Sequence, residues 1–299
     1  MSGPPPLEVA GSIAVVTGGA NGIGRGIVRA LLEADATVVV ADVEQDVMDA
    51  TVAALSESHP GRVSGIRTDV SDDSSVEALA DQVFAVHGRC NLLFNNAGVG
   101  SGGGGRVWMH EPNDWRWCYG VNVFGVAHGI MAFVPRMLDS GEPGHIVNTS
   151  SGDGGFAPVP TAALYASSKA AVSCMTESLD HQLRQDSGVM GASVLYPSGG
   201  LMDTGLFTSQ RNRPVELERV RGGTGRASMT FAEMKDRLEK AGRTVKVADL
   251  DELGRFVVEC VARRQYVIGR ELERTVELLH TRADAIGRFE MPPPHDMGL

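Results

Sequence analysis

The chain has 299 residues, carries a net charge of −10, and is 42% hydrophobic. This length is enough to bury a core in one large α/β domain or in two small ones. The acidic balance disfavours nucleic acid as a partner, because phosphate binding requires a basic surface. No apolar run is long enough to cross a bilayer, so we expect no membrane partner.

The four cysteines are scattered along the chain without C-x-x-C spacing. This pattern predicts reduced thiols in a cytoplasmic protein and disfavours a zinc site or a disulfide framework. The eight histidines show no ligand spacing either, so we expect no metal. Residues 1–6 lack the basic and apolar regions of a signal peptide.

The first predicted element is a buried strand at Ser12–Val16. A glycine-rich turn at 17–24 follows, then a helical pattern from Ile23 to Ala34 and a second buried strand at 37–41. A strand, a glycine turn, a helix and a second strand within about 30 residues predict a βαβ unit.

The alternation of strands and helices continues. Helices are predicted near 47–55, 73–84, 113–138 and after 165, strands near 63–67, 92–94, 145–148 and 192–196, and a glycine-rich loop at 100–105. This order predicts an α/β fold of the Rossmann type, a doubly wound parallel sheet between two layers of helices.

The pattern breaks after Pro197. Residues 201–245 are polar, with arginine-rich and glycine-rich patches, and predict a mobile insertion or substrate lid. A helix near 253–258, a strand at 266–268, a helix near 273–285 and a tail over 286–299 complete the chain. Because no internal repeat or interdomain linker is visible, we expect residues 1–299 to form a single dinucleotide-binding catalytic domain.

Tyr165 and Lys169 are four residues apart in a predicted helix, so their side chains share one face. An ammonium beside a phenol favours the phenolate and lowers a pKa that is ordinarily about 10. The tyrosine then becomes a proton donor and acceptor near neutral pH. Such pairs also occur on solvated helix faces, so this pair alone does not define a site.

The glycine turn lies between a strand end and a helix start, where a phosphate site is expected. Its glycines are spaced Gly-x-x-x-Gly-x-Gly, and the backbone there turns tightly enough to approach a pyrophosphate. The residues predicted to contact the cofactor at this turn are Gly18, Asn21, Gly22, Ile23 and Gly24.

Asp42 ends the second strand, where a carboxylate accepts hydrogen bonds from an adenosine ribose and repels a 2′-phosphate. No Lys or Arg stands at Val43, or at Ala20 or Asn21 in the turn, to offset that charge. The sequence therefore favours NAD over NADP. An exposed strand-end acid without a ligand is the alternative interpretation.

These motifs, taken in order, resemble the short-chain dehydrogenase/reductase family from Ser12 to about Thr204. The glycine turn is similar to the family's cofactor turn, Asn95-Asn96-Ala97-Gly98 to its motif after the fourth strand, and Tyr165-x-x-x-Lys169 to its catalytic signature. The resemblance implies further cofactor contacts from Asp69, Val70, Asn96, Ala97, Gly98, Tyr165, Lys169, Pro197 and Thr204. The run Pro197-Ser198-Gly199-Gly200 departs from the family pattern by placing serine where glycine is usual and by adding residues before Thr204.

The resemblance also implies four catalytic residues, namely Asn122, Ser151, Tyr165 and Lys169. Tyr165 would exchange the hydroxyl proton, Lys169 would lower the pKa of Tyr165 and bind the cofactor ribose, and Ser151 would bind the substrate oxygen. Asn122 would hold a water that links Lys169 to solvent. Ser150 is the alternative to Ser151.

The implied activity is hydride transfer between NAD(H) and a secondary alcohol or ketone in a homodimer or homotetramer. Asp114-Trp115-Arg116-Trp117 and Arg211-Asn212-Arg213-Pro214 look similar to a branch that includes dehydrogenases of lignin-derived aryl alcohols, which implies a bulky apolar or aromatic substrate. Two alternatives remain open at this point: an NADPH-dependent carbonyl reductase and a non-catalytic dinucleotide-binding protein on the same fold.

Overall fold

The structure is a computed structural model that describes residues 6–101, 105–221 and 229–294. Parts of the predicted glycine-rich loop (102–104), lid (222–228) and tail (295–299) lie outside the described residues, as do residues 1–5 at the start of the chain.

A seven-stranded parallel sheet in the order β3-β2-β1-β4-β5-β6-β7 forms the centre of the molecule. Its strands are β1 (Ile13–Thr17), β2 (Thr37–Asp42), β3 (Val63–Arg67), β4 (Leu92–Asn95), β5 (Gly144–Thr149), β6 (Met190–Leu195) and β7 (Val267–Ile268). The winding reverses between β1 and β4, and in open α/β sheets ligands bind beyond the carboxyl ends of the strands at such a reversal.

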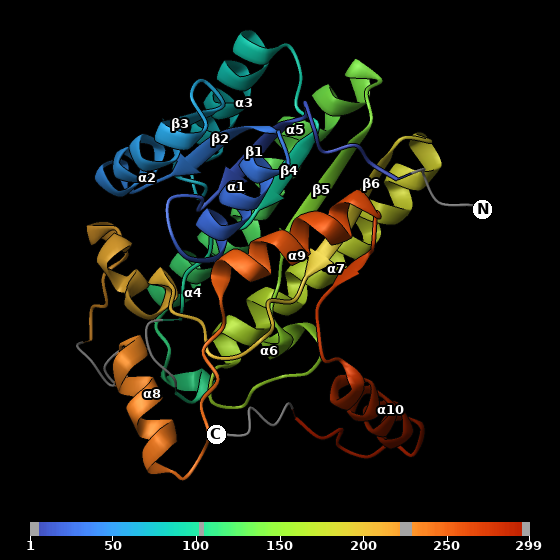
Figure 1. Ribbon diagram of the computed structural model, residues 1–299. Coiled ribbons are helices and arrows are strands. Elements are labelled where there is room, and N and C mark those ends of the chain that lie inside the picture. The colour runs from blue at the N-terminus through green and yellow to red at the C-terminus, as the bar shows by residue number, and fades with distance from the viewer. Residues whose placement is uncertain (1–5, 102–104, 222–228, 295–299) are drawn as a thin grey trace.

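Helices cover both faces of the sheet (Figure 1). One face packs against α1 (Gly22–Glu33), α2 (Gln45–Ser58) and α9 (Leu250–Ala262), and the other against α3 (Asp73–His87), α5 (Gly125–Ser140) and α7 (Ala163–Asp186). Neighbouring residues of one strand point to opposite faces, so Val16 packs with the first group and Val15 with the second. The predicted three-layer Rossmann-type fold is confirmed.

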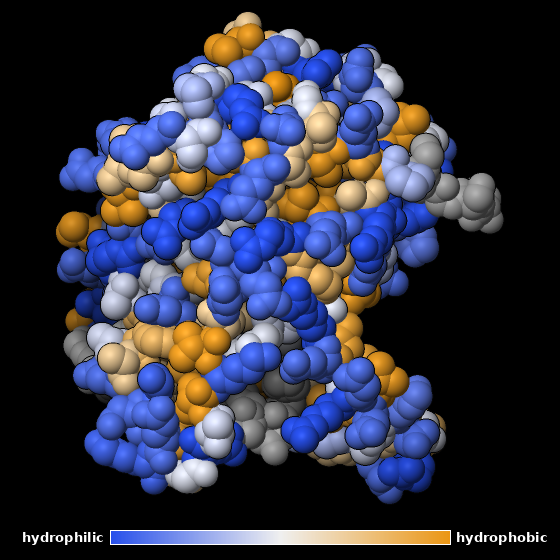
Figure 2. Space-filling view, viewed as in Figure 1, coloured by the Kyte–Doolittle hydropathy of each residue, from blue (hydrophilic) through white to orange (hydrophobic). Residues whose placement is uncertain are grey.

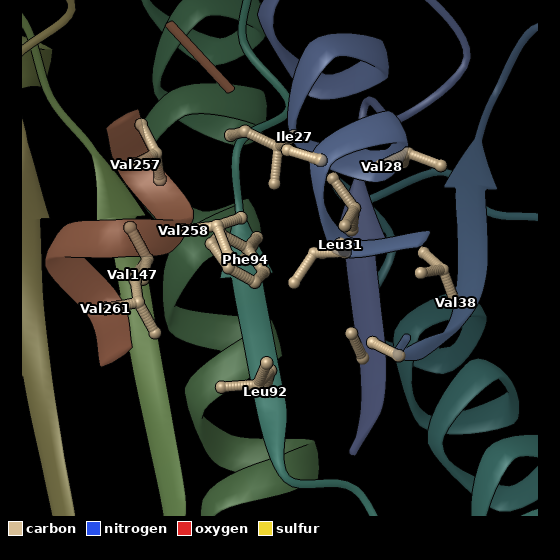
Figure 3. Close-up of a cluster of buried hydrophobic side chains, with 14 of the residues drawn as sticks. Ile27, Val28, Leu31, Val38, Leu92, Phe94, Val147, Val257, Val258 and Val261 are labelled. Carbon is tan, nitrogen blue, oxygen red and sulfur yellow. The ribbon is translucent and has the colours of Figure 1, made fainter. Parts of the chain in front are cut away.

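The core on the first face holds the start of α1 near the sheet reversal. Ile27 and Leu31 of α1 and Val258 of α9 gather around Phe94 of β4 (Figure 3). Phe94 is 1% exposed, and Ile27 and Leu31 are fully buried. Burial of each such side chain stabilises the fold by roughly 1.5–3 kcal/mol.

The central helix, predicted as one run over 113–138, has three parts. They are α4 (Pro112–Tyr119), the π-helical η2 (Gly120–Phe124) and α5. Single-turn π segments recur at functional sites, and this one contains Asn122. Contrary to the expectation from the sequence, one helical run, Pro112–Ser140, is long and apolar enough to span a membrane, but half of its most apolar stretch is buried inside the fold, as in a core helix.

The predicted lid contains more regular structure than its sequence indicated. Its described residues form η3 (Gly205–Asn212), η4 (Val215–Leu217) and α8 (Phe231–Lys240). Asp114 of α4 is fully buried and binds Arg213 at 2.8 Å and Arg219 at 2.8 Å, which attaches the lid to the central helix. The sequence predicts mobility from the polar, arginine-rich and glycine-rich composition of this segment, whereas the buried acid that binds Arg213 and Arg219 lies 99 and 105 positions away in the chain.

Three further helices complete the described chain: η1 (Val107–Met109), α6 (Gly152–Gly155) and α10 (Glu273–Gly287). The strand boundaries match the predictions within two residues, and most of the helices extend a few residues beyond them. In Figure 2, α10 stands apart from the body at the lower right, and polar side chains cover most of this face of the molecule.

Candidate active site

The glycine turn is bound to the end of β4 by a compact set of hydrogen bonds. The Thr17 hydroxyl accepts the backbone N–H groups of Asn96 (3.0 Å) and Ala97 (3.1 Å), and the Asn96 side chain donates to the carbonyls of Thr17 and Gly18. Gly18 has a φ of +62°, and a Cβ there would lie 2.8 Å from the Ala97 backbone. The motif after β4 therefore supports the turn, and Thr17 is a supporting residue that the sequence reading did not single out.

The start of α1 fits an anionic phosphate group. Its N-cap, Asn21, makes no side-chain capping bond within the described structure, and the first turn of the helix contains no acidic residue. A cavity opens beside this helix start and is lined by Gly22, Ile23 and Thr204. A Cβ on Gly22 would lie 3.3 Å from the Thr204 side chain. Backbone N–H groups at a helix start favour negative charge, so the turn fits the pyrophosphate of a dinucleotide.

Asp42, Asp69 and Val70 line this cavity at the ends of β2 and β3, which lie across β1 and β4 from β5, the strand that precedes α7 in the chain. The Asp42 carboxylate accepts the N–H groups of Ala20 at 3.0 Å and Glu44 at 3.1 Å. Burial raises the pKa of Asp42, and these hydrogen bonds oppose that effect. Asp69 caps its own turn by accepting the Ser71 N–H at 2.9 Å.

A basic side chain reaches this end of the cavity from the lid, contrary to what the sequence around Asp42 indicated. Arg211 forms a forked ion pair with Glu44, with Arg211 Nε 3.0 Å from the carboxylate, and both residues line the cavity beside Asp42. The two residues are 167 positions apart. No local motif connects them: the sequence pointed to Arg211 only as part of a branch motif, and Glu44 was not predicted to be a site residue.

At the other end, α7 presents Tyr165 and Lys169 on one face, as predicted from their spacing. Lys169 Nζ lies 5.8 Å from the centroid of the Tyr165 ring and donates to the Thr149 carbonyl at 2.9 Å. The Lys169 side chain is buried, with 3% of the residue exposed.

Ser151, rather than Ser150, meets the tyrosine. Ser151 is hydrogen-bonded to Tyr165 and accepts the N–H of Asp153 at 3.1 Å as the N-cap of α6. The Ser150 hydroxyl instead donates to the backbone carbonyl of Lys169 at 2.8 Å. Neighbouring residues of an extended chain point in opposite directions, which separates the two serines.

The pKa of Tyr165 differs from the expectation based on its spacing from Lys169. The ring keeps some exposed surface, but burial of the hydroxyl raises the pKa of the phenol, the bond to Ser151 opposes this, and the nearby Asp153 reinforces it. Burial also lowers the pKa of Lys169 to about 8. In the protein alone, the cost of burying charge therefore exceeds the attraction between the two side chains.

The side chain of Asn122 is fully buried and occupied by protein partners. Its oxygen accepts the Val99 N–H at 2.8 Å, and its amide donates to the Val99 carbonyl and the Ser168 hydroxyl, each at 3.0 Å. A Cβ on Gly98 would lie 3.5 Å from both Asn122 Oδ1 and Lys169 Nζ. The Asn122 side chain therefore fixes the loop beside Lys169, and the water that this residue is expected to hold stays a prediction.

The unusual run after Pro197 has a structural reason. Gly200 has a φ of +131°, and a Cβ there would lie 2.3 Å from the Lys246 carbonyl. Ser198, which stands in the usual glycine position, accepts the Arg270 N–H at 2.9 Å. The extra residues thus allow the start of the lid to form backbone hydrogen bonds with residues 246–248. Both Pro197 and Thr204 line the cavity.

The cavity has a volume of about 520 Å³ and joins the two ends. Beside Tyr165 its wall includes Ser151 and Asp153. Several apolar side chains, drawn from the central helix, the loop after β4 and the lid, also line it: Val99, Trp117, Val121, Leu206, Phe207 and Pro214. The site can hold an elongated ligand with phosphates at the turn and an apolar group near Tyr165.

Comparison with known proteins agrees with this geometry. Residues 12–214 match the family model for short chain dehydrogenases. The chain is 37% identical over 205 residues to the C alpha-dehydrogenase of Sphingobium sp. strain SYK-6, a match that covers 68% of this chain and 65% of that relative. It is 34% identical over 225 residues to the 1-deoxy-11-beta-hydroxypentalenate dehydrogenase of Streptomyces avermitilis, covering 75% of this chain and 78% of the relative.

Among solved structures, a short-chain dehydrogenase/reductase from Burkholderia phymatum in complex with NAD superposes with a TM-score of 0.85. It is 35% identical, and the match covers 97% of this chain and 100% of that chain. The protein is an oxidoreductase that binds a nicotinamide dinucleotide. This class is defined by the parallel sheet with its glycine turn and by the relatives, which are named as dehydrogenases. The chain belongs to the short-chain dehydrogenase family. The predicted family is confirmed, as is the likeness to the C alpha-dehydrogenase branch. Members of this family act on small molecules and are often oligomeric.

Proposed function

We propose that this protein is an NAD-dependent dehydrogenase that interconverts a bulky apolar or aromatic secondary alcohol and its ketone, with Tyr165 as the acid/base. The observation that carries the proposal is the contact of Ser151 with Tyr165 in a cavity that also contains the phosphate turn. Residues 1–299 then form one catalytic domain, because the sheet takes strands from residue 13 to residue 268.

Tyr165 and Ser151 both face the reacting oxygen of the substrate in this scheme. The nicotinamide, when bound, supplies the hydride acceptor and a positive charge near the phenol. During oxidation Tyr165 accepts the hydroxyl proton as a phenolate, the form that the positive charges of the nicotinamide and of Lys169 would favour, and during reduction the phenol returns the proton. Ser151 donates a hydrogen bond to the substrate oxygen as negative charge develops there, a role that stabilises the transition state.

Lys169 has two roles in this proposal: it binds the cofactor ribose, and its positive charge lowers the pKa of Tyr165. Its Nζ is the buried cation nearest to the phenol in the described cavity wall, and its pKa of about 8 keeps it mostly protonated at neutral pH. We assign Asn122 a positioning role, since its side chain fixes Val99 and the loop beside Lys169.

The preference for NAD rests on Asp42, which lines the cavity near Glu44 and Arg211. We call this part of the cavity the adenosine end, because the adenosine ribose of the cofactor is expected there. A specific observation favours the NADPH-dependent carbonyl reductase as a second candidate, because Arg211 stands in the same wall and guanidinium groups bind phosphates. Its pairing with Glu44 weighs against that candidate.

The substrate class is supported by the apolar wall around Trp117 and Phe207, and by the likeness to the C alpha-dehydrogenase. Trp117 is only 2% exposed, so its main contribution is a rigid wall rather than a mobile contact. A bulky apolar alcohol would bury its hydrocarbon there while its oxygen reaches Tyr165.

We also propose a cytoplasmic homodimer or homotetramer. The central helix region leaves large apolar side chains exposed, among them Trp108 (73%), Phe124 (55%) and Met131 (62%), as an interface between subunits requires. The cysteines are free, and Cys90, Cys118 and Cys260 are buried, as reduced thiols in the cytoplasm are.

A screen of NAD reduction over aryl, alicyclic and steroidal secondary alcohols tests the proposal. We expect turnover with one class of bulky alcohols and much weaker turnover with NADP. Absence of turnover with either cofactor across alcohols and ketones would instead favour the non-catalytic dinucleotide-binding protein, which bound NADH fluorescence would then reveal.

A further inference from the structure

Glu44 is the point at which the lid is attached to the adenosine end of the cavity. Its carboxylate receives Arg211 Nε at 3.0 Å and Asn212 Nδ2 at 2.9 Å, and a second nitrogen of Arg211 completes the fork. The remaining Arg211 nitrogen donates to the Gly205 carbonyl at 3.1 Å and to the Thr208 hydroxyl at 2.8 Å. The guanidinium is therefore held in one orientation by its own segment and by Glu44.

This ion pair is next to the carboxylate that is expected to face the adenosine ribose. Asp42 Oδ1 accepts the backbone N–H of Glu44 at 3.1 Å, and Asp42, Glu44 and Arg211 line one cavity. Among the described residues of that wall, Lys169 and Arg211 are the basic ones, and Lys169 belongs to the catalytic end. Arg211 is thus the side chain in place to bind a 2′-phosphate, because a guanidinium pairs with phosphate oxygens through two parallel hydrogen bonds.

We propose that Glu44 is a second determinant of cofactor choice: by holding Arg211 in an ion pair, it withholds the guanidinium from the 2′-phosphate of NADP. The inference rests on the proposed NAD-dependent function and extends it from Asp42 to a residue of the lid. With the pair intact, the net charge around the ribose hydroxyl is that of Asp42, which is negative. Without Glu44, Arg211 offsets Asp42 and offers free donors.

The pair is present at neutral pH. Partial burial raises the pKa of Glu44, but the hydrogen bonds from Arg211 and Asn212 lower it more, so the pKa lies below its ordinary value. Both side chains keep contact with solvent, with 22% of Glu44 and 36% of Arg211 exposed. An anion from solution can therefore compete with Glu44 for Arg211, and the effect of the ion pair on cofactor selectivity depends on the anions present.

The experiment compares Glu44→Gln, the double variant Glu44→Gln/Arg211→Met and the control Asp46→Asn. Asp46 lies two residues further on, is exposed, and carries the same charge without contacting Arg211. Calorimetry measures the affinity for adenosine 2′,5′-bisphosphate relative to 5′-AMP, a ratio that does not depend on hydride transfer. The ratio of kcat/KM for NADP to that for NAD is the second measurement.

In Glu44→Gln we expect both ratios to rise about 10-fold or more, the size of one charge-assisted hydrogen bond. The double variant should return to within about 3-fold of the wild type, and Asp46→Asn should change the ratios by less than about 3-fold, as expected for an exposed charge. An unchanged ratio in Glu44→Gln overturns the proposal. So does a rise that persists in the double variant, because it would reflect lost negative charge rather than a released Arg211.

Failure of the proposed function is a separate result. Wild-type protein that binds both nucleotides but turns over no alcohol with NAD would contradict the proposed reaction while the binding ratios still decide the role of Glu44. Wild-type protein that binds neither nucleotide would overturn both proposals.

Discussion

The two ends of the cavity are built in contrasting ways. At the catalytic end, Tyr165 and Lys169 come from a single helix, and the Lys169 side chain is almost entirely buried. At the adenosine end, Asp42 ends β2 and Glu44 follows it, while Arg211 belongs to the lid, and more than a third of the Arg211 side chain is exposed. Buried charges act strongly and singly, whereas exposed ones are screened and contribute little each.

This contrast implies that the chemistry depends on individual side chains and cofactor choice on the sum of several. Replacement of one group at the catalytic end should therefore change rates by orders of magnitude. Replacement of one group at the adenosine end should change selectivity by a smaller factor and leave the rate of the chemical step nearly intact.

The largest effect is expected for Tyr165→Phe. The variant keeps the ring and its packing but removes the proton acceptor, so kcat should fall about 10²- to 10⁴-fold, the usual contribution of general acid–base catalysis. Titration of NADH fluorescence should give an affinity close to that of the wild type. A Phe variant with wild-type kcat would remove Tyr165 from the reaction.

Ser151→Ala is expected to rank second. It removes a hydrogen-bond donor aimed at the reacting oxygen, and loss of one such donor costs about 10²- to 10³-fold in kcat. Ser150→Ala is the matched comparison, because the Ser150 hydroxyl is hydrogen-bonded to the Lys169 carbonyl and the Ser173 hydroxyl instead.

Steady-state kinetics of the two serine variants separates their roles. We expect Ser150→Ala to lower kcat less than about 10-fold, as a change in packing beside Lys169 would. If Ser150→Ala were the more damaging substitution for kcat, the assignment of the two serines would be reversed.

Asp42→Ala should have a smaller effect, confined to cofactor binding. Loss of the ribose contact is expected to weaken NAD binding about 10-fold and to raise the preference for NADP relative to NAD. Because Asp42 also accepts the Ala20 N–H, Asp42→Asn is needed beside it to keep an acceptor while removing the charge. Unchanged cofactor preference in both variants, measured as the ratio of kcat/KM values, would eliminate Asp42 as a determinant.

The placement of Tyr165 and Lys169 was predictable from sequence because local spacing fixes it, whereas Ser151 and Asn122 were named from the resemblance to the family. Helix geometry alone puts Tyr165 and Lys169 on one face, and strand–turn–helix order alone puts Gly18 and Gly22 near a phosphate site. The same is true of the Rossmann-type fold, whose alternating apolar strands and amphipathic helices are local patterns.

The adenosine end and the lid were less predictable because their contacts join distant segments. Nothing near Glu44 in the sequence indicates a partner 167 positions away, and nothing near Arg213 indicates that Asp114 is buried beneath the lid. The direction of the Tyr165 pKa was wrong for a related reason, since burial depends on the whole fold and not on the four-residue spacing.

The last expected effect concerns stability and not the rate of the reaction: a change in the pH dependence of stability in Lys169→Met. Burial lowers the pKa of Lys169 from 10.5 to about 8, so between those values the unfolded chain binds more protons than the folded one. The wild type should therefore gain stability as pH rises through this window, by up to ~3 kcal/mol, and gain nothing from this group below pH 8 or above pH 10.5. The Met variant lacks this dependence, and the comparison is made between pH 8 and 10, below the range in which the raised pKa of Tyr165, itself sensitive to a charge on residue 169, adds its own pH dependence. Urea unfolding of the two proteins at a series of pH values measures the difference. Stability curves that run parallel from pH 8 to 10 would mean that the surroundings of Lys169 do not disfavour its charge. The contrast between the two ends of the cavity would then lose its electrostatic basis.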